Sequence, residues 1–129
     1  MPKEILHLDQ IKVLVDSFYI KVREDESLGP IFDEVIQDRW PQHMEKMYRF
    51  WQTILLGEHT YYGSPFGPHA KLPIDEAHFD RWIELFSQTV DAHFSGEKAE
   101  EAKWRAARMA DLFQSKIEYY RENAVKPIV

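Results

Sequence analysis

Residues 40–57 read WPQHMEKMYRFWQTILLG and carry two overlapping stripes of side chains at helical spacing. The first stripe is Trp40, Met44, Met47, Trp51 and Leu55, and the second is His43, Met47, Phe50 and Ile54. Pro41 suits the first turn of a helix, where its missing N–H costs nothing, and Gly57 suits the C-terminal stop. The pattern predicts a helix with an unusually broad buried face, on which His43 is directed inward.

The following segment, from Gly57 to Pro73, concentrates glycine and proline and is the main interruption of the helical pattern. It contains SPFGPHA at residues 64–70, so His69 directly follows a proline. A second histidine is therefore expected in a constrained loop, whereas His43 stands on a rigid helix.

Two helical segments precede residue 40. Residues 9–24 place apolar side chains on one face at helical spacing, and Asp9 is expected to cap the start of this helix. The tripeptide Leu28-Gly29-Pro30 then breaks the pattern. Residues 31–36 suggest a short helical piece that turns the chain.

Two longer helices are expected after the loop. Asp75 is a suitable N-cap for a helix that continues to about Phe94, and Ser95-Gly96 separates it from the last helix. The last helix carries an apolar stripe from Ala102 to Tyr120, with small residues in its first half that allow close approach. No segment alternates with period two, so the sequence predicts an all-α fold.

The composition indicates one globular domain over residues 1–129. Hydrophobic residues make up 44% and aromatic residues 14% of the chain, which excludes a disordered protein and leaves apolar material to line a cofactor cavity. The net charge is −6 and the basic residues are dispersed, so nucleic acid is an improbable partner. Charged residues interrupt the first thirty positions before any signal peptide or membrane span is complete, and we expect a soluble cytoplasmic protein.

The chain has no cysteine, which removes thiolate catalysis and leaves histidine as the main soft-metal ligand. Of the six histidines, His7, His59 and His93 have polar or turn-forming neighbours and are expected to be surface or partly buried residues and not ligands. His43 and His69 are too far apart for a helical H-E-x-x-H metal site. Two histidines on separate elements suit a flat cofactor held between them, which points to haem, with one histidine on the iron and polar groups on the opposite face.

Tyr19 and Trp82 fall on the inward stripes of their helices and are either ordinary core residues or hydrogen-bond donors. Together with His43 they can hold a small diatomic ligand in an otherwise apolar cavity. His78, one turn before Trp82, is the rival of His69 for the iron. His69 is preferred because its loop is better suited to wrap a haem edge, while a helix start carries a positive dipole.

The order of these pieces resembles the truncated haemoglobin family, and within it group III. The pieces that carry the resemblance are Phe18-Tyr19, Lys21-Val22-Arg23, Leu28-Gly29-Pro30-Ile31-Phe32, Trp40-x-x-His43, Phe50-Trp51, Leu55-Leu56-Gly57-Glu58, Tyr61-x-Gly63-x-Pro65, His69, Leu72-Pro73 and Phe79-x-x-Trp82-x-x-Leu85-Phe86. They span about residues 18–86. The glycine pairs typical of group I are absent, which agrees with group III.

The resemblance implies a truncated globin-like two-over-two helical sandwich around haem b, iron protoporphyrin IX. It implies that His69 is the proximal iron ligand and that Tyr19, His43 and Trp82 are the distal residues that bind the ligand. The residues implied to line the haem are Met47, Phe50, Trp51, Phe66 and Phe79. Oxygen is the expected ligand, with NO and CO as further diatomic gases.

Several functional alternatives stay open at this stage. High oxygen affinity would suit retention more than oxygen transport, and whether the protein is also an enzyme is uncertain. NO dioxygenation or peroxide chemistry would need a reductase that the sequence does not identify. His43 can gate the pocket, donate a hydrogen bond or coordinate the iron itself. The alternative from another class is a cofactor-free helical interaction module whose aromatic residues form ordinary core.

Overall fold

A computed structural model of the chain describes residues 3–63 and 74–124. Within these ranges the chain forms five α-helices, which are α1 (Leu8–Glu24), α2 (Gly29–Ile36), α3 (Trp40–Leu56), α4 (Glu76–His93) and α5 (Glu97–Ala124). The described residues contain one isolated β-bridge, between Lys3 and Phe94, and no strand. The predicted all-α class is therefore confirmed.

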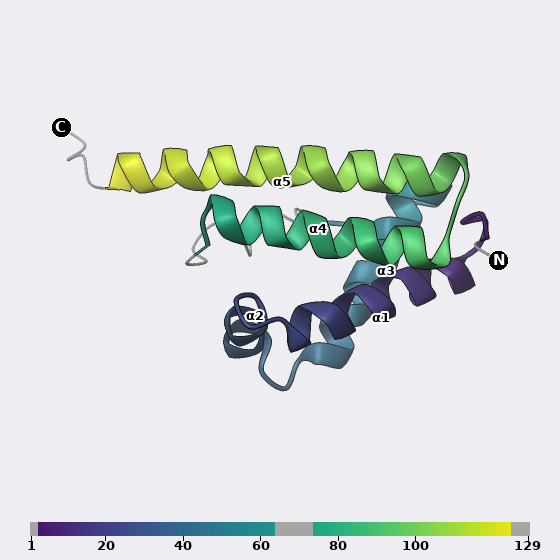
Figure 1. The fold of residues 1–129 in the computed structure, drawn as a ribbon, viewed down its shortest axis with the longest axis horizontal. Helices are drawn as coiled ribbons and strands as arrows, with labels where there is room; N and C mark the ends of the chain where they lie inside the picture. The colour runs from purple at the N-terminus through teal and green to yellow at the C-terminus, as the bar shows by residue number, and fades with distance from the viewer. Residues whose placement is uncertain (1–2, 64–73, 125–129) are drawn as a thin grey trace.

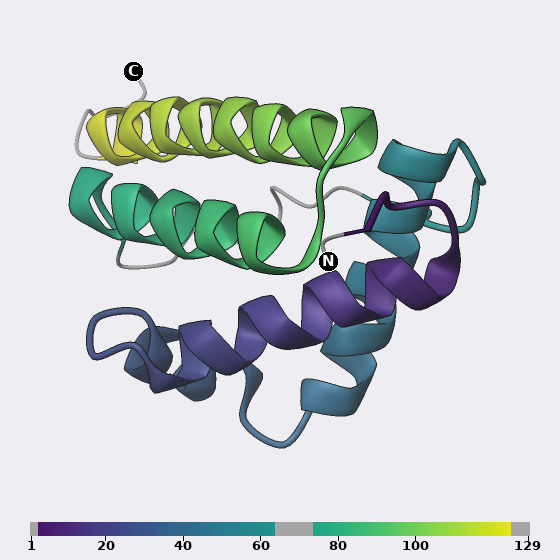
Figure 2. The same ribbon diagram turned by 45° about the vertical axis from the view of Figure 1, so that its right-hand side comes forward.

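The helices are arranged as two pairs (Figure 1). Helices α4 and α5 lie side by side in one pair, and α1 crosses α3 in the other, with α2 at the end of α1 (Figures 1 and 2). Helix α1 also packs against α4 and so joins the two pairs. This is the predicted two-over-two sandwich.

Helix α3 begins and ends as its sequence predicts. Pro41 lies in its first turn, and Gly57 follows its last residue with φ of 71°, a left-handed conformation that glycine adopts without steric cost. Its buried side chains come from both predicted stripes, and they include Trp40, Phe50, Trp51 and Leu55. The broad inward face is the reason why α3 can contact α1 and still line a cavity.

Two predicted helix starts are wrong in detail. Helix α1 begins at Leu8, and its N-cap is His7, two positions before the expected cap Asp9, which lies in the first turn. The backbone N–H of His7 donates to Oε1 of Gln10 at 2.8 Å. Helix α2 begins at Gly29, so Pro30 lies in its first turn and does not break the helix, since the first turn of a helix leaves the N–H at this position unpaired in any case. A Cβ at Gly29 would lie 2.5 Å from the carbonyl oxygen of Arg23, so glycine allows α2 to start against the end of α1.

The core is centred on stacked aromatic rings from three helices. Phe86 of α4 stacks on Trp51 of α3 at 5.1 Å between centroids and on Trp82 at 5.6 Å. Phe18 of α1 meets Phe86 edge-on at 5.2 Å. Stacked and edge-on pairs of this kind add to the free energy gained from burying the rings, so this cluster fixes how α1, α3 and α4 cross.

The start of the chain is fastened to the start of α5. The carboxylate of Glu4 accepts hydrogen bonds from the backbone N–H groups of Glu97 and Lys98, at 3.2 and 2.9 Å. A carboxylate is a favourable partner for the unpaired N–H groups and positive dipole of a helix start. Although α5 has 28 residues, neither it nor another helix in the described part of the chain has the apolar composition needed to cross a bilayer.

Candidate functional site

A cavity of about 870 Å³ lies among the helices. All five helices and residues 60–63 contribute side chains to its wall, and most of these side chains are aromatic or aliphatic. Ligand cavities in proteins commonly measure roughly 300–1,000 Å³, so this one is large enough for a large cofactor.

The cavity gathers the predicted site residues that fall within the described part of the chain. Those that line it are Tyr19, His43, Met47, Phe50, Trp51, Phe79 and Trp82. They come from α1, α3 and α4, and the crossing of these helices brings them together. The predicted residues Phe66 and His69 lie outside the described residues.

Tyr19 and His43 are in direct contact at one end of the cavity. Their ring centroids are 5.1 Å apart with the planes perpendicular, and Tyr19 is 7% exposed. Burial raises the pKa of the Tyr19 hydroxyl above its ordinary value, because ionisation would place a charge in an apolar environment. Tyr19 is therefore a neutral hydroxyl donor at any physiological pH. The Nε2 atom of His43 is also shielded from solvent.

Trp82 is placed by a different set of contacts. Its ring stacks on Phe86 and meets Phe18 edge-on at 5.3 Å, and Phe18 in turn meets Tyr19 at 5.1 Å. Phe18 therefore contacts both predicted donors, one beside it in α1 and the other in α4. The geometry of the two donors depends on how these helices pack.

Trp40 contributes more to the site than its sequence position indicated. Its ring meets His43 edge-on at 5.6 Å and lies 5.8 Å from Tyr19. It is held from outside by Asp33, which accepts from its Nε1 at 3.1 Å, and by the guanidinium of Arg23 at 4.3 Å from the ring centroid. The residue was predicted as part of a buried helical stripe, and only the tertiary contacts show that it supports His43.

The cationic side chains on the cavity wall were not predicted from the sequence. Arg39, Lys46 and Arg49 line the cavity, although Arg49 is also paired with Glu45 at 2.9 Å. A signal for two of them existed, because Arg39 and Lys46 stand four residues before and three residues after His43, on the same helical face. An apolar cavity with cations on its wall suits a flat, mostly apolar molecule that carries carboxylates.

His78 also lines the cavity, so the rival of His69 lies at the site. Its Nδ1 accepts a hydrogen bond from the backbone N–H of Asp75 at 3.1 Å, and the Asp75 carboxylate accepts from the His78 backbone N–H. These reciprocal bonds cap the start of α4. The imidazole of His78 therefore already has a structural role through one of its two nitrogens.

The fold is all-α, and its large aromatic cavity has an inward histidine and cations on its wall. These features are typical of proteins that enclose a flat prosthetic group. Residues 5–115 match the family model described as bacterial-like globin. The chain is 34% identical over 124 residues to the group 3 truncated haemoglobin of Campylobacter jejuni, covering 93% of this chain and 98% of that one.

A solved structure gives the same result. The crystal structure of a group III truncated haemoglobin from Campylobacter jejuni superposes with a TM-score of 0.83 and 34% identity, covering 91% of this chain and 95% of that chain. The chain thus belongs to the bacterial-like globins, in the group III truncated haemoglobin family. Membership makes it a haem-binding protein with diatomic gas ligands, which is the predicted class.

Proposed function

We propose that the protein retains O₂, and also binds NO and CO, at a b-type haem in this cavity. His69 would be the ligand of the iron, with Tyr19, Trp82 and His43 on the opposite face. The observation that carries the proposal is the buried side chain of Tyr19, in ring contact with His43 on the cavity wall. When bound, haem supplies an iron atom that holds a diatomic gas.

The cavity residues fit this cofactor by their chemistry. Met47, Phe50, Trp51 and Phe79 offer apolar surfaces for the faces and edges of the macrocycle, and Phe66 would join them from the loop. Arg39 and Lys46 offer positive charge for its carboxylates. The cavity volume of about 870 Å³ agrees with a ligand of this size.

Tyr19 would be the principal donor to the gas ligand. Its hydroxyl keeps its proton because burial raises its pKa, and the apolar wall around it strengthens any hydrogen bond that it makes. A hydrogen bond to a partly charged acceptor contributes roughly 1–3 kcal/mol, which corresponds to a slowing of ligand release by about five-fold or more. Slow release favours retention over transport.

Trp82 and His43 would have supporting roles. The indole N–H is only a donor, and the stacking on Phe86 holds the ring of Trp82 in one orientation. His43 can donate, gate or coordinate the iron, and its contacts with Tyr19 and Trp40 restrict how far its ring can move. Coordination by His43 would give a low-spin ferric absorption spectrum when no other ligand is present.

Turnover would require a second protein. Oxidation of NO by O₂ to nitrate consumes one electron for each NO, so repeated cycles would need a reductase as partner. Mixing the oxygenated protein with NO in a stopped-flow instrument, with and without a reductant, tests this activity. Nitrate formation beyond one equivalent only when reductant is present would support it.

The absorption spectrum of protein purified from haem-replete cells tests the cofactor and its ligand together. We expect a Soret band that His69→Ala removes and that added imidazole restores. His78→Ala is the matched control and should retain the band. Loss of haem in His78→Ala but not in His69→Ala would show that His78 of α4 is the iron ligand. A colourless wild-type protein would favour the cofactor-free interaction module.

A further inference from the structure

Asp25 is a charged residue at the junction of α1 and α2, and its side chain is largely covered. Its side chain is 5% exposed, and its Oδ2 atom accepts hydrogen bonds from the backbone N–H groups of Ser27 and Leu28 at 3.0 Å each and from the Ser27 hydroxyl at 2.7 Å. Its carbonyl oxygen accepts from the N–H of Gly29 at 2.9 Å. Asp25 thus holds the connection between the two helices in one conformation.

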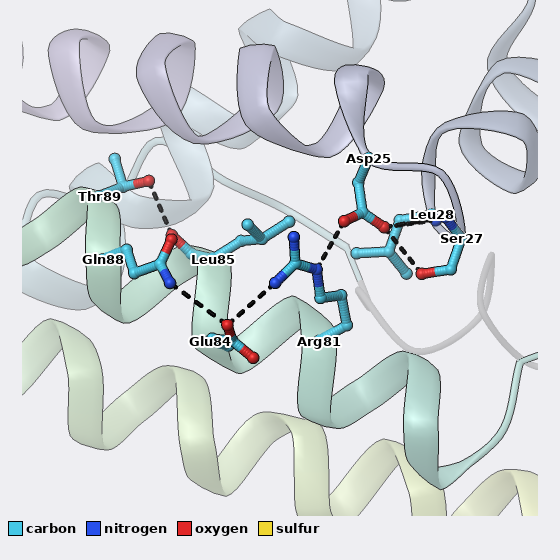
Figure 3. A network of polar contacts seen from close by, with 8 residues as sticks. All are labelled: Asp25, Ser27, Leu28, Arg81, Glu84, Leu85, Gln88 and Thr89. Carbon is cyan, nitrogen blue, oxygen red and sulfur yellow. Dashed lines mark hydrogen bonds and ion pairs between the residues drawn. The ribbon is translucent and has the colours of Figure 1, made fainter.

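The other carboxylate oxygen of Asp25 reaches α4. Its Oδ1 atom accepts from Nε of Arg81 at 2.6 Å, across 56 positions of sequence (Figure 3). The guanidinium of Arg81 is held a second time, because its Nη1 donates to Glu84 at 2.9 Å, and Glu84 also accepts from Gln88 (Figure 3). The Asp25 carboxylate is largely covered and the Arg81 side chain is 40% exposed, and the second bond to Glu84 orients the guanidinium for its charge-assisted bond to Asp25.

The ion pair of Asp25 and Arg81 lies next to the cavity but does not form part of its described wall. Asp25 and Arg81 are absent from the described wall of the cavity, but Leu28, whose N–H Asp25 binds, and Trp82, the neighbour of Arg81, both line it. The contacts that join this side of α1 to α4 include the edge-on rings of Phe18 with Trp82 and Phe86. They also include the ion pair of Arg81 with Asp25, which directly follows α1.

The ring contacts set how α1 and α4 cross through apolar packing. The ion pair near the end of α1 adds a directional, charge-assisted contact between the two helices. We propose that Asp25 and Arg81 form a positioning pair that fixes Trp82 on α4 relative to Tyr19 on α1. The pair thereby sets the rate of O₂ release from outside the cavity, and this consequence rests on the proposed distal roles of Tyr19 and Trp82.

The first test reads the position of Trp82 without any gas ligand. The chain has four tryptophans, and in protein labelled with 5-fluorotryptophan the resonance of Trp82 is assigned by its loss in Trp82→Phe. We expect Arg81→Met to shift this ¹⁹F resonance in both the apo and the haem-loaded protein. Arg81→Lys, which keeps the charge, should restore most of the wild-type shift, and Glu84→Gln, which leaves the bond to Asp25, should change little. The exposed Trp104 on α5 is the internal reference.

The second test is the O₂ dissociation rate of the haem-loaded protein. Arg81→Met should change this rate by at least about three-fold in the wild-type background and by much less in the Trp82→Phe background, as expected for coupled residues. If Arg81→Met does not fold, Asp25→Asn takes its place, because its amide oxygen can still accept from the Ser27 and Leu28 N–H groups. An unmoved Trp82 resonance, or equal effects in the two backgrounds, overturns the proposal.

The two tests separate this inference from the proposed function. If Tyr19→Phe and Trp82→Phe both leave the O₂ dissociation rate unchanged, the proposed distal roles are wrong, whatever the ion pair does. If those variants change the rate and Arg81→Met does not, the distal roles stand and the positioning role is wrong.

Discussion

Tyr19 is a buried tyrosine of α1 that meets four aromatic rings: Phe18, Phe32, Trp40 and His43. Its position on the inward stripe was readable from the periodicity of residues 9–24. Its contacts with α3 were not, because they depend on how α1 crosses that helix. Burial raises the pKa of the hydroxyl, so the group is a permanent donor and not an acid.

Replacing Tyr19 by phenylalanine should speed the release of O₂ at least several-fold, because one hydrogen bond to the ligand is lost while the ring packing stays. Stopped-flow displacement of O₂ by CO measures the rate. Tyr48→Phe on α3 is the matched control, since it removes a hydroxyl that donates to Asp16 and lies off the described cavity wall. An unchanged rate in Tyr19→Phe would remove this residue from the distal site.

At the scale of elements, most helix limits follow from local signals. Asp75 caps α4 as predicted, and its carboxylate accepts from the N–H of His78. Gly57 stops α3 because its left-handed conformation is available to glycine. The start of α5 is different: its first N–H groups are bound by Glu4, which lies 93 positions away from Glu97 in sequence. No local pattern can reveal a cap that comes from the other end of the chain.

We expect Glu4→Ala to lower the free energy of unfolding by about 1 kcal/mol, the usual cost of losing a helix cap. Urea unfolding followed by circular dichroism measures it. Glu4→Gln should lose less, because the amide oxygen can still accept a hydrogen bond. Glu26→Ala, at an exposed position between α1 and α2, is the control and should change stability by less than about 0.5 kcal/mol. Equal losses in the Glu4 and Glu26 variants would contradict the capping role.

For the molecule as a whole, the contacts between distant segments that join the helix pairs include two of different kinds. The first is the aromatic cluster around Phe86, which joins α1, α3 and α4. The second is the ion pair of Asp25 with Arg81. Burial raises the pKa of Asp25, but the hydrogen bonds from Arg81, Ser27 and Leu28 outweigh burial and lower the pKa to about 2.

This lowered pKa makes the stability of the fold sensitive to acid. The unfolded chain has the ordinary aspartate pKa of about 3.9, so between about pH 4 and pH 2 it binds more protons at Asp25 than the folded chain. The stabilisation from Asp25 is therefore complete above about pH 5 and is lost as pH falls through this window.

Urea unfolding between about pH 6 and pH 3 measures this contribution as the difference between the wild type and Asp25→Asn. The wild type should lose stability more steeply, since asparagine does not titrate. Asp38→Asn, at an exposed position between α2 and α3, is the control. Parallel curves for the wild type and Asp25→Asn would show that Asp25 does not carry this acid sensitivity.

The sequence by itself determined the helices and their inward faces, because helical periodicity is a local property. It also carried the family resemblance that the comparisons confirm. Only the tertiary structure decided that Trp40 supports His43, that Glu4 caps α5 and that Asp25 binds Arg81. Each of these contacts depends on the angle and register at which helices cross, and the packing of the whole core sets that angle.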